Sequence, residues 1–152
     1  MINLFYVSTE IFLSLSILFL LLIGVFKKKS ESFIYNFSSI ILLVGLAINI
    51  NLSPQSPIDL FNNSYKIDYF TTLIKSVILI SAFLVMLCSL NYVKQNDILK
   101  IEYPILILSS ILGMLVMVSS NDLMVFYVGL ELQSLALYVL AAFKRDDIFS
   151  SE

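Results

Sequence analysis

The 152-residue chain contains no histidine and no tryptophan, and it has only one cysteine, three prolines and four glycines. Without histidine it lacks the commonest metal ligand and the one side chain that ordinarily titrates near neutral pH. The single cysteine, Cys88, lies within an apolar run, so no disulfide framework or cysteine metal site is possible. Metal and nucleophilic chemistry are therefore not expected, and we expect this chain to bind no metal and no cofactor.

Charge is also scarce, with 13% of residues charged and a formal net charge of −2. The only basic cluster, Lys27 to Lys29, offers a polyanion little to bind, so we do not expect a nucleic-acid partner. Hydrophobic residues make up 59% of the chain, which is too apolar for a soluble domain of this length. The composition therefore indicates an integral membrane protein of the all-α, polytopic class.

Hydropathy predicts five transmembrane helices, because about 20 mainly apolar residues are needed to cross a bilayer. Lys27 to Lys29 end the first apolar run, and the region of Pro54 and Pro57 ends the second. Only a short turn separates the fourth run from the fifth, so these helices should be antiparallel neighbours, with Asn121 or Asp122 capping the fifth. The expected spans, within a single membrane domain, are residues 9–26, 33–52, 69–93, 104–119 and 123–143.

The fifth expected span carries one ionisable residue near its middle, Glu131. A charge at the centre of a bilayer helix costs between about 2.5 and more than 10 kcal/mol, so such residues face a protein interior or a water path. At 3.6 residues per turn, Tyr127, Ser134 and Tyr138 lie within about 60° of Glu131, and we name these four residues the Glu131 stripe. Two interpretations remain open: a proton-relay site, or a packing stripe in which a protonated Glu131 only hydrogen-bonds a neighbouring helix.

Two further ionisable residues lie near the expected membrane boundary. Lys75 is about two turns inside the third span, where snorkelling of its stem toward the headgroups is favoured over a role in a proton path. Glu10 lies at the outer end of the first span and is expected to be solvated. Gly45, Gly113 and Gly129 are interpreted as small residues that permit close helix contact.

The carboxyl-terminal part of the chain carries a series of specific motifs, which are Glu102-Tyr103-Pro104, Gly113-Met114, Ser119 to Leu123, and Tyr127 to Ala141. Together these motifs resemble subunit 2 of the proton-pumping NADH:ubiquinone oxidoreductase, complex I. The antiporter-like siblings of that subunit typically have a tryptophan immediately before the matching glutamate, where this chain has Leu130. The resemblance is strong from Glu102 onward and loose before it.

The resemblance implies the amino-terminal part of an antiporter-like subunit that translocates protons in the membrane arm and has no redox centre of its own. Glu131 matches the glutamate of the fifth helix, which the family pairs with a lysine on a later, broken helix. FMN, iron–sulfur clusters and ubiquinone belong to the complex as a whole, and the partners are the other membrane-arm subunits. Because this sequence stops at Glu152, before that lysine, we expect a split subunit whose remainder is a second polypeptide.

The amino-acid composition suggests the membrane in which the protein lies, and the sequence leaves two alternative functions open. Richness in Ile, Leu, Phe, Asn, Ser and Lys suits an AT-rich organellar genome, so we expect the mitochondrial inner membrane, with lipids around the helices. One alternative is a structural or assembly protein whose helices only anchor a larger complex. Another is a part of a cation/proton antiporter. A continuous polar path from Glu131 to a lysine on another chain would favour the proton relay.

The distribution of basic residues predicts the orientation. The loops after the first, third and fifth spans fall on one side and hold seven of the nine lysines and arginines, namely Lys27, Lys28, Lys29, Lys94, Lys100, Lys144 and Arg145. The positive-inside rule then places the amino terminus and residues 53–68 in the intermembrane space and the carboxyl end in the matrix. In a Cys88→Ser background, a cysteine introduced at Ser56 should react with an impermeant thiol reagent from the outer side. Labelling from the matrix side alone would contradict this orientation.

Overall fold

The computed structural model describes residues 2–26, 31–54, 56–95 and 101–142 of the chain. Its helices are α1 (Ser8–Phe26), α2 (Glu31–Asn51), α3 (Tyr69–Gln95), α4 (Glu102–Ser119) and α5 (Leu123–Ala141). All five are long and apolar enough to cross a membrane, which confirms the prediction of an all-α polytopic protein. A 3-10 helix, η1 (Ile2–Val7), precedes α1, and two short strands, β1 (Ile58–Leu60) and β2 (Tyr65–Ile67), lie between α2 and α3.

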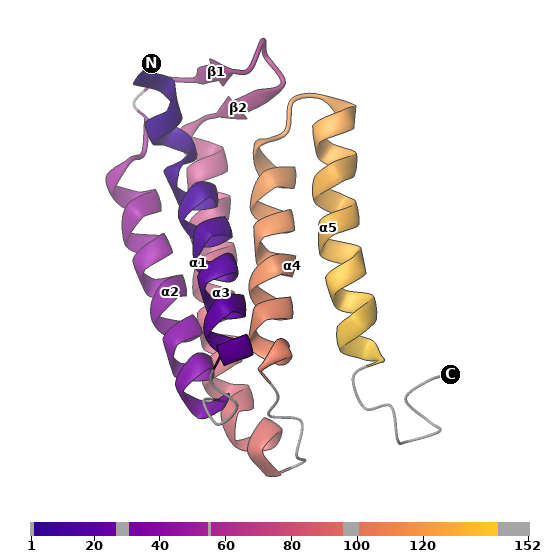
Figure 1. Ribbon diagram of the computed structural model, residues 1–152. Coiled ribbons are helices and arrows are strands. Elements are labelled where there is room, and N and C mark those ends of the chain that lie inside the picture. Colours follow the sequence, from indigo (N-terminus) through magenta and orange to yellow (C-terminus); the bar gives the residue numbers. More distant parts are fainter. Residues whose placement is uncertain (1, 27–30, 55, 96–100, 143–152) are drawn as a thin grey trace.

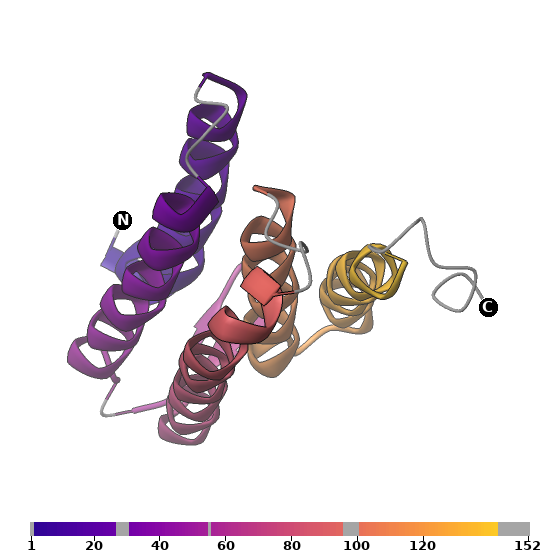
Figure 2. The ribbon, with the colours of Figure 1, turned by 90° about the horizontal axis from the view of Figure 1, so that it is seen from below.

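The helices run up and down in sequence order, and four of them share one apolar core (Figure 1). Fully buried side chains of α1 to α4 form this core, among them Leu13, Leu42, Leu79 and Leu108. Viewed along the helices, α5 stands at the edge of the bundle and packs on α4 (Figure 2). Helix η1, the β1–β2 hairpin and the α4–α5 turn lie together at one end, which we name the hairpin end (Figure 1).

The hairpin was not predicted, because the polar residues between the expected spans 33–52 and 69–93 were assigned to a loop with no helix or strand. Its strands pair antiparallel, and the tight turn between them holds Phe61, Asn62 and Asn63 at positive φ, a conformation that asparagine tolerates better than most residues. The Asn121 backbone N–H donates to the Ser64 carbonyl at 3.0 Å, and the Asn121 amide donates to the Asn63 carbonyl at 2.8 Å. The hairpin is thereby fixed to the α4–α5 turn.

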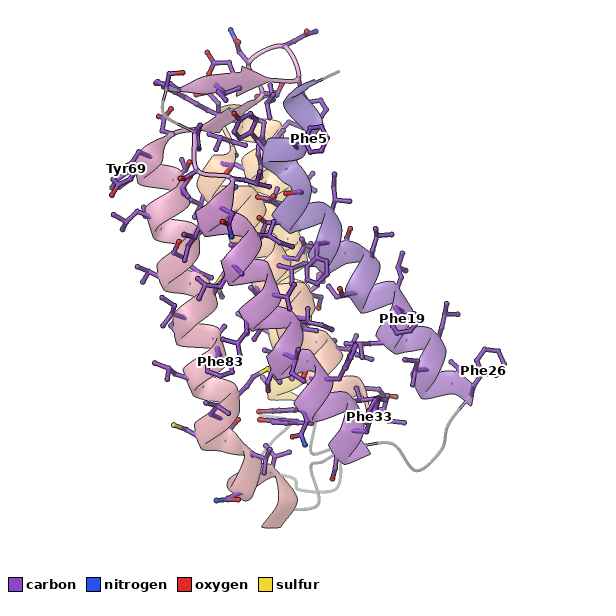
Figure 3. All side chains as sticks on the ribbon, turned by 90° about the vertical axis from the view of Figure 1, so that its left-hand side faces the viewer. Phe5, Phe19, Phe26, Phe33, Tyr69 and Phe83 are labelled. Atoms are coloured by element: carbon purple, nitrogen blue, oxygen red, sulfur yellow. The ribbon has the colours of Figure 1, made fainter. Side chains whose placement is uncertain are left out.

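Side chains around the hairpin close off this end of the bundle. Leu60, Tyr65 and Ile67 of the strands are buried, and Tyr6 and Val125 pack against them from η1 and α5. Figure 3 shows the hairpin lying across the ends of the helices. Residues 58–67, which were expected to lie in a loop, therefore form a hairpin that covers this end of the bundle.

The turn between α4 and α5 has the predicted form. The two helices are antiparallel neighbours, and the side chain of Asp122 accepts a hydrogen bond from the backbone N–H of Met124 at 3.4 Å. This contact confirms Asp122 as the cap of α5. The loops that hold Lys27 to Lys29, Lys100, and Lys144 and Arg145 lie outside the described residues, so the orientation in the membrane stays a prediction.

Close contact between α4 and α5 depends on two glycines. A Cβ atom on Gly113 would lie 2.7 Å from the backbone nitrogen of Gln133 and 2.7 Å from the carbonyl oxygen of Gly129. A Cβ atom on Gly129 would lie 2.8 Å from the Cγ of Met117. The predicted packing role of these two glycines is confirmed. Gly45 differs, because the nearest atom to a Cβ there is a methyl of Leu13 at 3.9 Å, an ordinary contact.

We predict that Gly113→Ala weakens the α4–α5 contact. The new methyl would meet backbone atoms that cannot rotate away, so the helices must separate, at a cost of about 1–3 kcal/mol in the free energy of unfolding. Gly45→Ala is the matched control, because its methyl has room and should leave stability nearly unchanged. Unfolding of both variants in lipid or detergent, followed by circular dichroism, measures the difference. Equal stability of the two variants would show that the helices do not depend on this contact.

Candidate functional site

The Glu131 stripe lies along one side of α5, as its spacing predicts. Glu131 and Ser134 are half-buried, whereas Tyr127 and Tyr138 are 60% and 68% exposed. The side chain of Tyr127 interacts with the Glu131 carboxylate one turn further along the helix. The hydroxyl of Ser134 donates to the carbonyl oxygen of Glu131 at 3.1 Å and so is used within the helix backbone. Within the described part of the chain, no ion pair includes Glu131.

The stripe faces away from the core of the bundle. Gly129 and Ala136 are the buried residues of α5, and this face meets α4. Glu131 lies roughly 140° to 160° around the helix from both of them, because successive residues are about 100° apart. Helix α5 packs on α4 at the edge of the bundle (Figure 2), so the side opposite Gly129 and Ala136 is left uncovered by α1 to α4. In a bilayer, that side must meet either lipid or another helix. Contact with another helix is strongly favoured, because a carboxylate in contact with lipid tails has a high free-energy cost.

A second ionisable site lies at the hairpin end, between α1 and α3. The Lys75 ammonium lies 2.5 Å from Oε1 of Glu10, and the two residues are only 2% and 6% exposed. The expectation of a solvated Glu10 is therefore wrong, and so is the snorkelling interpretation of Lys75. The physical reason is that the hairpin covers this end, so Lys75 finds a carboxylate inside the protein instead of a headgroup outside it.

Tyr65 of β2 completes this site. Its hydroxyl donates to the same oxygen, Oε1 of Glu10, at 2.7 Å, and the Lys75 ammonium lies 5.4 Å from the centre of its ring. Burial raises the pKa of Tyr65 far above its ordinary value, and the negative charge of Glu10 raises it further. Tyr65 is therefore a neutral hydrogen-bond donor. We name Glu10, Tyr65 and Lys75 the Glu10 cluster.

The second carboxylate oxygen of Glu10 is unusual. Oε2 is buried and has no hydrogen-bond partner among the described residues. Both donors thus converge on one oxygen and leave the other free. A buried acceptor without a partner costs about 1–3 kcal/mol, so this arrangement carries a penalty that a structural ion pair would not require.

The sequence holds a signal that points to this pair. With alternating crossings, the start of the first span and the start of the third lie at the same membrane surface, and each carries one charge of opposite sign, Glu10 and Lys75. Tyr65 could not be found this way, since it reaches the site from a segment read as a loop. The two acidic sites lie on opposite sides of α4, which packs against α1 and α3 on one side and α5 on the other.

The fold and these two sites define a polytopic α-helical membrane protein that keeps carboxylates within its membrane-spanning helices. No family model matches the chain. Comparison with curated proteins does find relatives. The chain is 52% identical over 151 residues to the NADH-quinone oxidoreductase subunit N of Pelagibacter ubique (strain HTCC1062), a match that covers 99% of this chain and 32% of the relative.

Two other bacterial relatives carry the same name. Subunit N of Rhodobacter capsulatus is 40% identical over 147 residues, and subunit N of Rhodospirillum rubrum is 39% identical over 145 residues. These matches cover 96% and 94% of this chain and 30% of each relative. The chain is thus homologous to NADH-quinone oxidoreductase subunit N, the bacterial equivalent of subunit 2, and it spans about a third of the length of the relatives it matches. The match with the Pelagibacter relative extends through the residues before Glu102, where the motifs gave only a loose resemblance.

We predict that Tyr65→Phe destabilises the hairpin end, because it removes a hydrogen bond to a charged group worth about 1.5–3 kcal/mol. The pKa of Tyr65 is raised in the folded state, so its contribution is complete below the unfolded tyrosine pKa of about 10 and is lost as pH rises through the folded value. Unfolding measured from pH 7 to strongly alkaline pH should show the gap between wild type and variant closing only above about pH 10. A constant gap across that range would contradict the assigned bond.

Proposed function

We propose that this chain is part of a proton-translocating subunit in the membrane arm of an NADH:quinone oxidoreductase, and that Glu131 serves there as a proton-relay acid. The observation that carries the proposal is the position of the Glu131 stripe on a side of α5 that α1 to α4 leave uncovered. The homology to subunit N supports the assignment to this complex. The chain's contribution is proton transfer, and electron transfer through FMN, iron–sulfur clusters and quinone takes place in other subunits.

The proposed relay needs a cation beside Glu131. A lysine ammonium close to the carboxylate stabilises its charged form and favours proton release, whereas withdrawal of the ammonium leaves a desolvated acid that favours proton uptake. A movement of the lysine thereby becomes a change in the proton affinity of Glu131. Tyr127, one turn away, is placed to hydrogen-bond the carboxylate in either state.

The stripe is proposed to meet transmembrane helices that correspond to the part of the relatives' length that this chain does not span. The relatives are about three times as long as this chain, and the helices in their remaining length would supply both the cover for α5 and the lysine. Other membrane-arm subunits would contact the outer surface of the assembled subunit. In this proposal the exposed apolar residues of α1 to α3 face lipid or those subunits.

The proposed setting is an energy-coupling membrane with the hairpin end on its outer side. Composition favours the mitochondrial inner membrane, with the amino terminus in the intermembrane space. The bacterial relatives fit a bacterial cytoplasmic membrane with the same orientation. The proposed function is the same in both membranes, because each membrane separates the side on which protons are released from the side on which NADH is oxidised.

We predict that Glu131→Gln leaves the complex assembled and lowers NADH-driven proton pumping, because glutamine keeps the volume and much of the hydrogen bonding but carries no exchangeable acid proton. Glu131→Ala should add an assembly defect on the order of 3–5 kcal/mol, since it leaves a buried cation without its partner. Ser134→Ala is the matched control on α5, because among the described residues the Ser134 hydroxyl bonds only the backbone of its own helix. Pumping, NADH oxidation and the amount of assembled complex should be measured together.

Full pumping by a well-assembled Glu131→Gln complex would remove the relay and leave a packing role, as in a structural or assembly subunit. A lowered ratio of protons to electrons identifies a missing proton path. An unchanged ratio of protons to electrons, with slower NADH oxidation, indicates instead that the proton path is intact and that the whole complex turns over more slowly. Sodium-dependent proton exchange by the same membranes without NADH would favour the cation/proton antiporter alternative.

A further inference from the structure

We propose that the Glu10 cluster is a second proton-exchange site, separate from Glu131, that opens toward the hairpin end. Its role in coupled translocation rests on the function proposed above. The site consists of an acid and a base that are both buried, whereas the other buried polar side chains of the described residues are neutral. Replacing a buried ion pair with apolar residues is often neutral or stabilising, so the pair is poorly explained as a device for stability. Ionisable residues retained inside membrane helices instead mark ion or proton pathways.

The geometry of Glu10 suits the gain and loss of a proton. Lys75 and Tyr65 both donate to Oε1, while Oε2 is buried with no partner among the described residues. A proton that binds Oε2 forms an O–H bond and leaves Oε1 as a carbonyl oxygen that still accepts from the same two donors. Protonation at Oε2 therefore removes the negative charge of the buried carboxylate without breaking either hydrogen bond. The charge of the cluster changes from zero to +1, or stays at zero when the proton comes from the Lys75 ammonium.

Few other groups compete for this proton. Among the described residues, α3 contributes Lys75 and β2 contributes Tyr65, whose raised pKa keeps it neutral. Helix α4 contributes the hydroxyl of Ser119, which is not an acid at ordinary pH. The tyrosine of α2, Tyr35, bonds the Met86 carbonyl and Ser89 and takes no part in the cluster. Glu10 and Lys75 are thus the pair that can exchange a proton here.

We place Asp68 between this pair and the surface in the proposed path. It lies directly before α3 and seven residues before Lys75, so it sits on the same side of the helix and about 10 Å further toward the hairpin end. One of its oxygens pairs with the partly exposed Lys66 at 3.5 Å, and the other, Oδ1, is buried without a partner among the described residues. Two carboxylate oxygens without partners among the described residues, Oε2 of Glu10 and Oδ1 of Asp68, therefore lie at different depths below the hairpin end. Water between them would carry protons from the surface to Glu10.

The test uses the assembled complex in its membrane with three variants. These are Glu10→Gln, the charge-neutral double variant Glu10→Gln/Lys75→Met, and the control Ser81→Ala on α3, whose exposed hydroxyl donates to the Ile78 carbonyl of its own helix and lies outside the Glu10 cluster. If Glu10→Gln alone fails to assemble, the double variant keeps the test valid, because it leaves no unpaired buried charge. We expect the assembled double variant to oxidise NADH but to pump protons about 100-fold more slowly, the loss expected when a positioned proton-transfer group is removed. The control should pump normally.

Normal pumping by a fully assembled double variant would overturn the proposal and leave a structural ion pair. Glu131→Gln measured in parallel separates the two proposals. If Glu131→Gln stops pumping and the double variant does not, only the Glu10 proposal fails. An infrared difference spectrum between low and high pH gives an independent readout. A protonated-carboxyl band that disappears in Glu10→Gln supports the exchange site, and identical spectra of wild type and Glu10→Gln contradict it.

Discussion

The free-energy cost of an ionised side chain in hydrocarbon is the constraint on which the rest of this structure depends. The chain meets that constraint in two ways. Glu10 is enclosed by α1, α3 and the hairpin and is neutralised within the chain by Lys75. Glu131 has no such partner among the described residues and lies on the side of α5 that the other helices leave uncovered. One acid is therefore complete within this chain, while the other requires a surface that α1 to α4 do not provide.

Helix α4 is the element that relates these two acids. It packs on α1 and α3 through apolar side chains and on α5 through the backbone contact that Gly113 and Gly129 allow. The hairpin is bonded through Asn121 to the turn that joins α4 to α5. If gain or loss of a proton at Glu131 displaces α5, that displacement would therefore be transmitted to the β1–β2 hairpin, which covers the Glu10 cluster. This connection gives the two sites a physical route for coupling, through packed helices and one hydrogen-bonded turn.

The sequence was sufficient for features that depend on local pattern. Runs of apolar residues give the five helices, the spacing of Asp122 before a helix gives its cap, and the period of 3.6 residues places the Glu131 stripe on one side. Features that depend on contacts between distant segments were missed. The Glu10–Lys75 pair joins residues 65 positions apart, and Tyr65 reaches it only because residues 58–67 fold into a hairpin. A polar loop composition carries no period from which that hairpin could be predicted.

The central claim is that the Glu131 side of α5 is a buried protein interface with a cation beside the carboxylate. A cryo-EM structure of the intact assembly in lipid tests it most directly. We expect helices from outside this chain to cover Tyr127, Glu131 and Tyr138, and a lysine ammonium to lie within about 4 Å of the Glu131 carboxylate or to be joined to it by ordered water. A structure in which that side of α5 meets only lipid tails, with no basic group near Glu131, would contradict it.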